Sequence, residues 1–267
     1  LGGSVNRYHL MSTLEYITLP WEVLGVGALW LILMAFFVAL PCSQMGSFLI
    51  LRRMALTGDA ISHSVFPGVV IAFFITGDLA SPWLIVGAGL AGLASTVIIE
   101  LIHKWTRVKQ DAATGISFTA LFALGVVLME VLLGKNVDLD LECVLHGRLG
   151  LLLEEDQVAL FGMLVPVPVL VMAGVSAFTM LLMGLFCRVM MLSSFDADLA
   201  ASYGYRPAVI HYSMMFVVSF IVVAAFQAVG AILVIALLIL PGAAAYLCTY
   251  RLKVMLMIAA LHALLSA

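Results

Sequence analysis

The sequence predicts an all-α polytopic membrane protein with about seven or eight transmembrane helices, and three observations lead to that fold class. Of the 267 residues, 64% are hydrophobic and only 10% are charged, whereas a soluble domain carries about 25% charged residues. The apolar residues gather in segments of about 20, the length that crosses a bilayer as a helix. The basic residues stand in short clusters between those segments, and no Lys/Arg-rich run indicates nucleic-acid binding.

Each predicted span is a predominantly apolar segment, because a backbone in lipid must satisfy its own hydrogen bonds. We expect spans at residues 23–51, 63–77, 82–103, 112–133, 158–187, 208–226 and 229–249, and an eighth that begins near residue 254. The second is short, and only FQAVG separates the sixth from the seventh. Transporters place irregular backbone beside a cavity in such segments, so we expect one irregular segment near the pore.

The chain is interpreted as one domain with an extension. Residues 1–20 form the N-terminal extension, in which LGGSVNRYHL precedes Met11 and resembles a vector remnant or a trimmed terminus. Residues 21–267 form a single transmembrane domain. No signal-peptide pattern precedes the first span, so we expect no cleaved leader. The final LHALLSA stops within an apolar run, and we expect the natural C-terminus to extend further.

The basic residues predict the orientation. Nine of the 12 Lys and Arg residues fall in alternate connections: Arg52, Arg53, Lys104, Arg107, Lys109, Arg188, Arg206, Arg251 and Lys253. Because cytoplasmic loops carry an excess of Lys and Arg, these connections are predicted to be cytoplasmic and the N-terminus external.

Small residues, prolines and cysteines are assigned to packing. Gly87, Gly89 and Gly92 in GAGLAGLAS are predicted to let helices approach closely. Residues expected to distort the fifth span or interrupt the end of the seventh are Pro166, Pro168, Pro241 and Gly242. The four cysteines, Cys42, Cys143, Cys187 and Cys248, lack CxxC spacing and are interpreted as apolar filler.

An aspartate and a histidine stand four residues apart in RRMALTGDAISHSVFPG, residues 52–68. On a helix this spacing places Asp59 and His63 on one face, close enough to share a ligand. A carboxylate and an imidazole suit a divalent transition metal, and an intramembrane carboxylate is costly without a function. The spacing leaves a second interpretation equally open, in which Asp59 caps a helix and His63 hydrogen-bonds a neighbouring helix.

Several further blocks follow this pair in order. GSFLILRRMALTGD precedes GDAISHSVFPGVVIAFF, and after it come DAATGISFTALFALGVVL, LHGRLGLL, SSFDADLAASYG and QAVGAILVIALLILPGAAAYL. Together these blocks resemble the membrane permeases of bacterial ABC importers for manganese, zinc and iron, whose signature reads GDAISHAVLPG. The resemblance covers most of the chain and implies that Asp59 and His63 are metal ligands on the translocation path.

The resemblance also implies partners. In that family the permease forms a homodimer in the bacterial inner membrane, pairs with two cytoplasmic ATP-binding subunits and receives metal from an extracytoplasmic binding protein. No GxxxxGK[ST] phosphate loop occurs here, so we expect ATP to be hydrolysed by the partner and no cofactor to be permanently bound. This chain is therefore not expected to be an enzyme by itself.

The stretch SSFDADLAASYGYRP, about residues 193–205, is predicted to be a short cytoplasmic helix. Phe195, Leu199 and Tyr203 form an apolar ridge along it, which suits either a groove in a partner or the lipid headgroups. The family resemblance implies a coupling helix that contacts the ATP-binding subunit through residues around Phe195, Asp196, Ala200 and Gly204.

Other polar residues receive structural interpretations. We expect Asp111 to cap the fourth span, while Glu100 and His103 extend toward the cytoplasmic membrane edge. Glu130 is interpreted as wetted near the outer end of its span, and Gln227 as bonded to backbone in the connection between the sixth and seventh spans. His211 and His262 are interpreted as hydrogen-bonded packing residues.

The leading hypothesis is therefore the permease of an ATP-driven importer for a divalent transition metal. The form GDAISH resembles the manganese and iron branch of that family more than the zinc branch, and manganese is the favoured metal, with zinc or iron as the other candidates. Two alternatives are a secondary cation transporter or channel, which would use the same pair without an ATP-binding partner, and a permease for a metal chelate. A bulky chelate calls for a wide aromatic and neutral polar path, whereas the Asp and His pair points to a bare ion.

Overall fold

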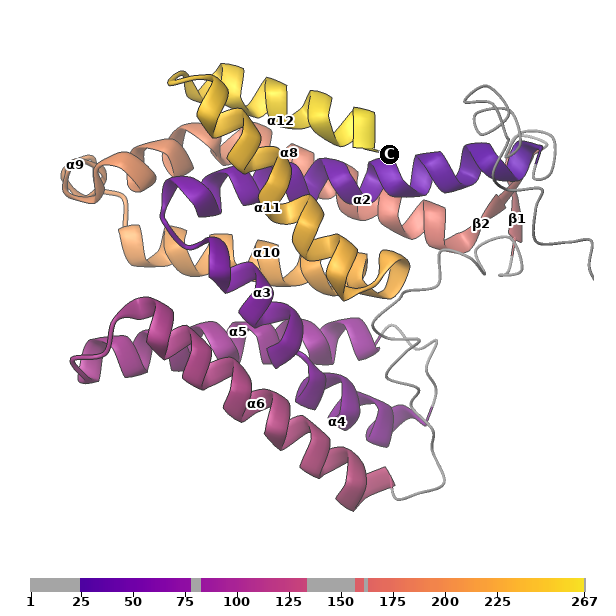
Figure 1. Ribbon diagram of the computed structural model, residues 1–267, viewed down its shortest axis with the longest axis horizontal. Coiled ribbons are helices and arrows are strands. Elements are labelled where there is room, and N and C mark those ends of the chain that lie inside the picture. The colour runs from indigo at the N-terminus through magenta and orange to yellow at the C-terminus, as the bar shows by residue number, and fades with distance from the viewer. Residues whose placement is uncertain (1–24, 78–82, 134–156, 161–162, 267) are drawn as a thin grey trace, which may run out of the picture.

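The computed structural model describes residues 25–77, 83–133, 157–160 and 163–266, and Figure 1 shows them as a bundle of helices. The elements are α2 (Val26–Leu51), α3 (Ala55–Ser64), α4 (Phe66–Thr76), α5 (Trp83–Trp105), α6 (Gln110–Leu133), β1 (Gln157–Leu160), β2 (Met163–Pro166), α8 (Val167–Phe195), α9 (Ala197–Ser202), α10 (Pro207–Val229), α11 (Ala231–Cys248) and α12 (Leu252–Ser266). The mostly helical class is confirmed, with one antiparallel hairpin as an addition.

Five described helices are long and apolar enough to cross a membrane, and they match the first, third, fourth, fifth and sixth predicted spans. Shorter apolar helices stand where the second, seventh and eighth spans are predicted: Phe66–Thr76, Ile232–Cys248 and Leu252–Ser266. The chain is therefore a multi-pass membrane protein, and the total of seven or eight spans stays a prediction.

The fifth predicted span, 158–187, is wrong at both ends. Its first residues form the strands β1 and β2, and α8 then continues to Phe195. Pro166 is the N-cap of α8 and Pro168 lies in its first turn, where a missing N–H costs no helical bond. These prolines therefore start the helix and do not distort it.

Pro241 and Gly242 were expected to interrupt the seventh span, and this expectation is also wrong. Helix α11 runs through both residues to Cys248. Gly242 serves packing, because a Cβ atom there would lie 3.0 Å from the backbone nitrogen of Ser47 in α2. Its lack of a side chain lets the two helices approach closely.

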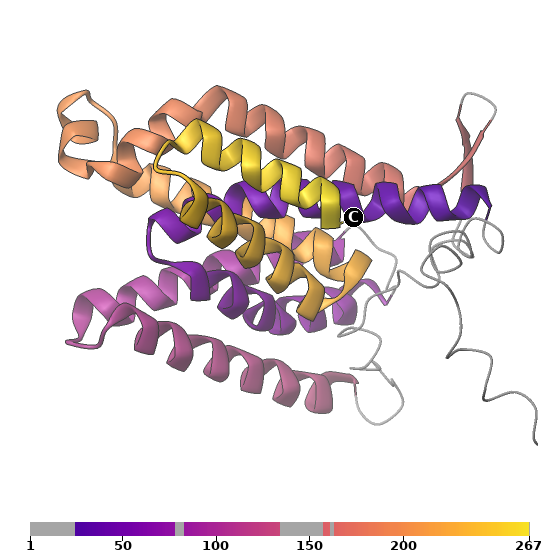
Figure 2. The same cartoon turned by 45° about the horizontal axis from the view of Figure 1, so that its top comes forward.

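The helices form two groups joined by α3 and α10 (Figures 1 and 2). In one group α2 packs on α8, α10, α11 and α12; in the other α4, α5 and α6 pack on one another. Helix α10 also packs on α5, and α3 contacts α5 and α6 as well as α2, α10 and α11. The helix that carries the Asp59–His63 pair thus lies between the two groups.

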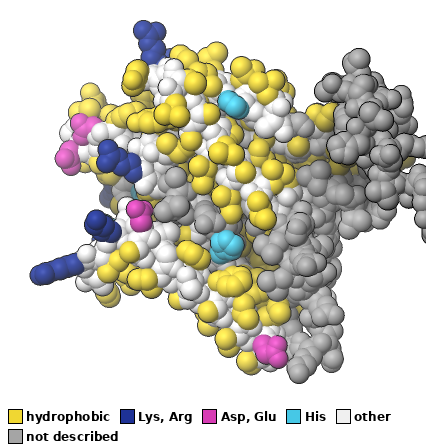
Figure 3. Space-filling view, viewed as in Figure 1, with side chains coloured by type: hydrophobic (Ala, Val, Ile, Leu, Met, Phe, Trp, Pro, Cys, Tyr) yellow, Lys and Arg dark blue, Asp and Glu magenta, His cyan; other side chains and the backbone are white. Residues whose placement is uncertain are grey.

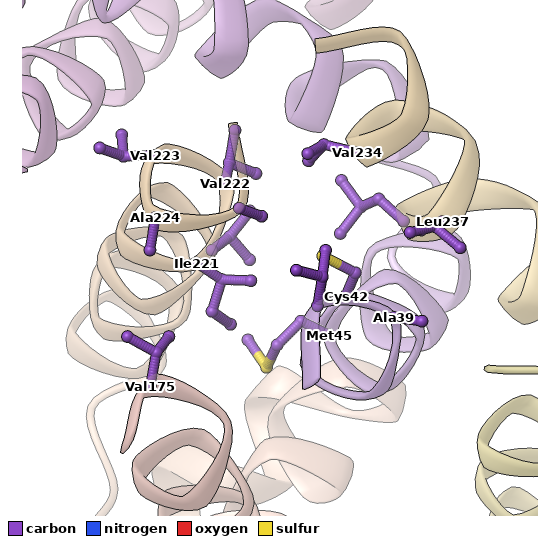
Figure 4. Packing of buried hydrophobic residues seen from close by; sticks show 14 of the residues in the cluster. Ala39, Cys42, Met45, Val175, Ile221, Val222, Val223, Ala224, Val234 and Leu237 are labelled. Atoms are coloured by element: carbon purple, nitrogen blue, oxygen red, sulfur yellow. The ribbon is translucent and has the colours of Figure 1, made fainter. Parts of the chain in front are cut away.

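The main apolar core lies in the first group, between α2, α8, α10 and α11. Figure 4 shows Cys42 and Met45 of α2 facing Ile221 and Val222 of α10, with Leu237 of α11 beside them. Cys42 is fully buried and unpaired, which agrees with its interpretation as apolar filler.

Close helix contacts depend on some of the predicted small residues. A Cβ atom on Gly87 would lie 2.7 Å from the Gly68 carbonyl oxygen, and one on Gly92 would lie 1.9 Å from Ser219 Oγ. At Gly89 a Cβ atom would meet nothing within 4 Å. The close-packing role is therefore confirmed for Gly87 and Gly92. Gly89 is buried and its carbonyl accepts from Ser219 Oγ of α10 at 3.5 Å, so it also lies at a helix contact, although a side chain would fit there.

In the described part of the chain, every Lys and Arg lies at the end of the bundle that carries α9 (Figures 1 and 3). Basic side chains are therefore gathered at one end, as the sequence predicts. By the positive-inside rule this end is predicted to be cytoplasmic. Large apolar side chains such as Phe74 and Leu185 are exposed along the helices, as lipid-facing residues are.

Candidate metal-binding and coupling sites

The turn that leads into α3 is short and tightly hydrogen-bonded. The N–H of Arg53 donates to the Ile50 carbonyl at 2.9 Å, and that of Met54 donates to the Leu49 carbonyl at 2.8 Å. Arg53 has a φ of 59°, the left-handed conformation that helix ends usually give to glycine. A non-glycine residue held there costs about 1 kcal/mol, so surrounding contacts must fix this turn.

The segment predicted as one short span at 63–77 is two helices, α3 and α4, separated at Val65. Pro67 has no N–H, so it cannot donate to the His63 carbonyl the bond of a continuous helix. The predicted start is wrong because the polar residues of LTGDAISHS lower the local hydropathy, although they are helical. The expectation of one irregular segment is confirmed here.

Asp59 and His63 lie on the same short helix, one turn apart, as the spacing predicts. The His63 ring is partly buried and lies 5.9 Å from the ring of Phe118 and 6.1 Å from that of Phe122, both on α6. The side chain of Asp59 lies outside the described part of the structure. The face of α3 that carries His63 therefore points toward α6.

The opposite side of α3 is closely packed. A Cβ atom on Gly58 would lie 2.1 Å from Leu238 of α11, and Ile61 is fully buried. Ser64 is also fully buried and donates its hydroxyl to the Ile61 carbonyl at 3.1 Å. The contact of Gly58 with Leu238 places α3 against the first helix group, while Ile61 lies near Gly92 of α5 and His63 faces α6 in the second.

The interpretation of Asp59 as a helix cap is wrong. The N-cap of α3 is Met54 and that of α4 is Val65, whereas Asp59 lies in the middle of α3. Asp59 therefore does not occupy the N-cap position, from which a side chain accepts hydrogen bonds from the unpaired N–H groups at the start of a helix. No group of three or more His, Cys, Asp or Glu side chains arranged for a metal occurs among those that the structure describes.

The coupling segment differs in detail from its prediction. Residues 193–205 are the end of α8, the short helix α9 and a turn, because Asp196 breaks the helix with a φ of −149°. Asp196 Oδ1 accepts from the Leu199 N–H at 2.9 Å and so caps α9. Ala200 is fully buried, and Gly204 ends the helix with a φ of 84°.

The apolar residues of this segment are nevertheless open to a partner. Phe195, Leu199 and Tyr203 are 66%, 43% and 71% exposed, although the break at Asp196 means that they do not share one helix. Beside them is an open hollow lined by Arg188, Val189, Leu192, Tyr203 and Tyr205. The cytoplasmic end thus presents apolar side chains around a shallow depression.

A polar cluster at the same end escaped the sequence analysis. It joins the ends of four helices, and its members are Arg52, Glu100, Lys104, Ser193, Ser194, His211 and Tyr212. His211 Nε2 lies 3.0 Å from Glu100 Oε1, a close approach without the alignment of a hydrogen bond. Tyr212 donates its hydroxyl to the other oxygen of Glu100, and Lys104 Nζ lies 3.0 Å from that oxygen.

Arg52 forms the other half of this cluster. Its guanidinium donates to Ser194 Oγ at 2.9 Å and to Ser193 Oγ at 3.2 Å, and lies 3.2 Å from His211 Nδ1. Burial lowers the pKa of the Arg52 guanidinium from its usual value, yet an arginine stays charged at physiological pH. Glu100 is therefore held within this cluster and does not simply extend to the membrane edge. His211 is hydrogen-bonded to the same cluster, so it is not isolated on its helix.

A signal for this cluster was present in the sequence. Glu100 and His211 are both predicted near the cytoplasmic ends of their spans, and ionisable groups in membrane segments pair with one another. Their separation in sequence does not reveal that α5 and α10 are neighbours, so the pairing could not be assigned.

The remaining polar residues fall as follows. Asp111 lies in the first turn of α6 and is exposed, one position beyond the N-terminal Gln110, so it is not the cap that was expected. His103 is exposed and its Nδ1 lies 3.0 Å from the Val108 carbonyl. Glu130 and His262 are exposed, and the side chain of Gln227 lies outside the described residues.

Residues 28–267 match the model of the ABC 3 transport family. The zinc transport system membrane protein TroD of Treponema pallidum is 44% identical over 210 residues, which are 79% of this chain and 57% of that protein. The chain thus spans little more than half the length of that relative.

Two relatives are covered over more of their length. The manganese transport system membrane protein MntC of Halalkalibacterium halodurans is 42% identical over 87% of this chain and 73% of its own. The manganese transport system membrane protein MntD of Bacillus subtilis is 40% identical over 89% of this chain and 80% of its own. Among solved structures, PsaBC from Streptococcus pneumoniae in complex with Fab is similar, with a TM-score of 0.75, 30% identity, and coverage of 95% of this chain and 84% of that one.

Proposed function

The chain belongs to the ABC 3 transport family, whose members here are manganese and zinc transport permeases, and from that premise we propose that it is the translocating subunit of an ATP-driven metal importer. Its cargo is a divalent transition metal ion, with Mn²⁺ favoured and Zn²⁺ or Fe²⁺ as the other candidates. ATP is bound and hydrolysed by a separate subunit.

One observation carries the proposal: Asp59 and His63 lie one turn apart on a short helix between two helix groups, where neither residue starts a helix. A carboxylate and an imidazole on one helix face offer an oxygen and a nitrogen donor to an incoming ion. A charged residue inside a membrane is retained only where function or pairing compensates its cost. Metal binding at this pair gives that compensation.

Transport follows from changing the shell around the ion. Mn²⁺, Zn²⁺ and Fe²⁺ take about four to six donors, so waters, backbone carbonyls or further side chains complete the shell. When the cavity opens outward, the ion exchanges waters for Asp59 and His63. When it opens inward, the geometry at the pair loosens and the ion regains water. The chain's own residues bind and release, and no covalent step occurs.

The preference for manganese rests on two observations. The signature GDAISH is closer to the manganese and iron branch of the family than to the zinc branch, and two of the three relatives described above are named for manganese. The third is named for zinc, and the same two donor atoms also suit tetrahedral Zn²⁺.

We assign the coupling contact to the segment around α9. Phe195, Asp196, Ala200 and Gly204 stand at the basic end of the bundle, where Phe195 is exposed and Tyr203 lines an open hollow. The proposed assembly is a permease homodimer in the bacterial inner membrane, with two ATP-binding subunits at this end. An extracytoplasmic metal-binding protein delivers the ion at the other end.

The test is uptake of radioactive or fluorescently reported Mn²⁺ into proteoliposomes that contain the chain and its ATP-binding subunit. The wild-type complex should accumulate Mn²⁺ only with ATP, and the Asp59→Ala, His63→Ala double variant should lose uptake. A Phe118→Leu variant, which alters a neighbour of His63 without removing a donor, is the matched control. Full uptake by the double variant refutes the site, and ATP-independent uptake by the chain alone indicates a secondary transporter or channel.

A further inference from the structure

The polar cluster at the cytoplasmic end joins two segments that the proposed transport function treats separately. Ser193 and Ser194 form the last turn of α8, directly before Asp196, the N-cap of α9. Arg52 is the C-cap of α2, directly before the turn into α3. The bonds from Arg52 to the two serines therefore tie the base of the coupling helix to the base of the site helix.

The Arg52 side chain is well suited to transmit a displacement. A guanidinium is planar and holds its donors in a fixed fork, so contacts at 2.9 Å and 3.2 Å to two adjacent serines define one orientation. Arg52 also contacts His211, and His211 in turn lies 3.0 Å from Glu100 of α5. Arg52 is thereby connected to the second helix group. A shift of the α8–α9 junction must either break these contacts or move Arg52.

The backbone beside Arg52 makes that movement consequential. Arg53 adopts the left-handed conformation with a φ of 59°, and the turn to α3 contains no spare residue, since Met54 is already the N-cap of α3. A stiff turn of this kind passes a rotation of the α2 end into α3 instead of absorbing it. Asp59 is the fifth residue of α3, so the proposed ligand pair moves with the start of the helix.

We propose that Arg52 is a positioning residue that transmits movement of α9 to the helix that carries Asp59 and His63. Glu100 and His211 form the second arm of this connection and keep α5 and α10 in register with it. The inference rests on the proposed transport function, since it assigns a mechanical role within that cycle. It concerns residues outside the proposed ligand pair Asp59 and His63.

The experiment measures Mn²⁺ uptake and ATP hydrolysis in the same proteoliposomes, with the ATP-binding subunit present. Arg52→Gln should lower the uptake per ATP hydrolysed by about tenfold, while assembly and the ATPase rate stay within about twofold. Arg52→Lys, which keeps the charge but loses the planar fork, should give an intermediate loss and serves if Arg52→Gln fails to assemble. Arg107→Gln is the matched control, because Arg107 is exposed in the turn between α5 and α6 and is not a member of the polar cluster.

A double-variant cycle separates transmission from simple stabilisation. Ser193→Ala, Ser194→Ala should lower the same ratio, and adding Arg52→Gln should cause little further loss, because the contact has already been removed. The proposal is overturned if the serine substitutions and Arg52→Gln lower the uptake per ATP independently, so that their effects multiply when combined. It is also overturned if the ATPase rate falls as much as the uptake. A normal ratio in Arg52→Gln refutes it while leaving the transport function intact. No ATP-dependent uptake by the wild-type complex refutes the transport function itself.

Discussion

Replacing Gly46 by alanine tests the close backbone contact between the core helices α2 and α11. A Cβ atom on Gly46 would lie 1.6 Å from the Leu238 carbonyl oxygen and 2.7 Å from its carbonyl carbon. Ordinary van der Waals contact begins at 3.4 Å, so the helices would need to separate by about 2 Å. Because the obstacle is backbone, no side-chain rotation can relieve it.

The cost follows from that geometry. Overpacking a core against side chains costs about 1–3 kcal/mol, and we expect Gly46→Ala to lie at or above about 3 kcal/mol since a helix backbone must move. The matched control is Gly184→Ala in α8, where an added Cβ atom meets nothing within 4 Å. There the better helix propensity of alanine should be neutral or stabilise by up to about 1 kcal/mol.

Thermal unfolding in detergent, followed by a thiol-reactive dye or by the monodisperse fraction after heating, compares the two variants directly. Gly46→Ala should unfold well below the wild type, and Gly184→Ala at or above it. The same substitution should also impair transport, because Leu238 packs on Gly58 beside Asp59. Equal stability of Gly46→Ala and Gly184→Ala would refute the close α2–α11 packing described here.

Three further predictions follow from single residues. Asp59→Asn should lower Mn²⁺ uptake by more than about tenfold with the complex still assembled, because it replaces the charged carboxylate of the proposed site by a neutral, weaker oxygen donor; unchanged transport rates in proteoliposomes would contradict this. Asp196→Ala should weaken α9 by about 1 kcal/mol through loss of the bond to the Leu199 N–H, which co-purification of the ATP-binding subunit would report as reduced recovery against an Asp198→Ala control. Gly230→Ala should destabilise by about 1–3 kcal/mol, since its φ of 83° and ψ of 164° fit glycine alone, and a melting temperature equal to wild type would exclude that strain.

The fold class and five membrane helices follow from hydropathy, because long apolar segments leave few alternatives in lipid. The ends of α8 and the start of α3 do not. Pro166 and Pro168 look like helix distortions in sequence, and only the strand pairing of β1 with β2 shows that they begin a helix. The helical stretch LTGDAISHS is much less apolar than the α4 helix that follows it, so hydropathy alone does not reveal that it is helical.

The candidate sites show the same division. The spacing of Asp59 and His63 predicts their common helix face, because helical periodicity is local. The cluster around Arg52 and Glu100 depends on which helix ends meet, and that is decided by packing of α2, α5, α8 and α10. Local patterns therefore identified the proposed ligands but not the contacts that hold their helix in place.

The position of α3 connects the local spacing of Asp59 and His63 with the packing of the two helix groups. Gly58 packs against Leu238 in the group that contains α11, whereas His63 faces Phe118 and Phe122 and Ile61 lies near Gly92 in the other group. A ligand pair on such a boundary changes its surroundings when the two groups shift, even if no hydrogen bond within α3 breaks. Rigid groups that move against each other around a fixed site are what alternating access requires. The bonds of Arg52 meet the same boundary at the cytoplasmic end, so a displacement that begins at α9 reaches the ligands by way of their own helix.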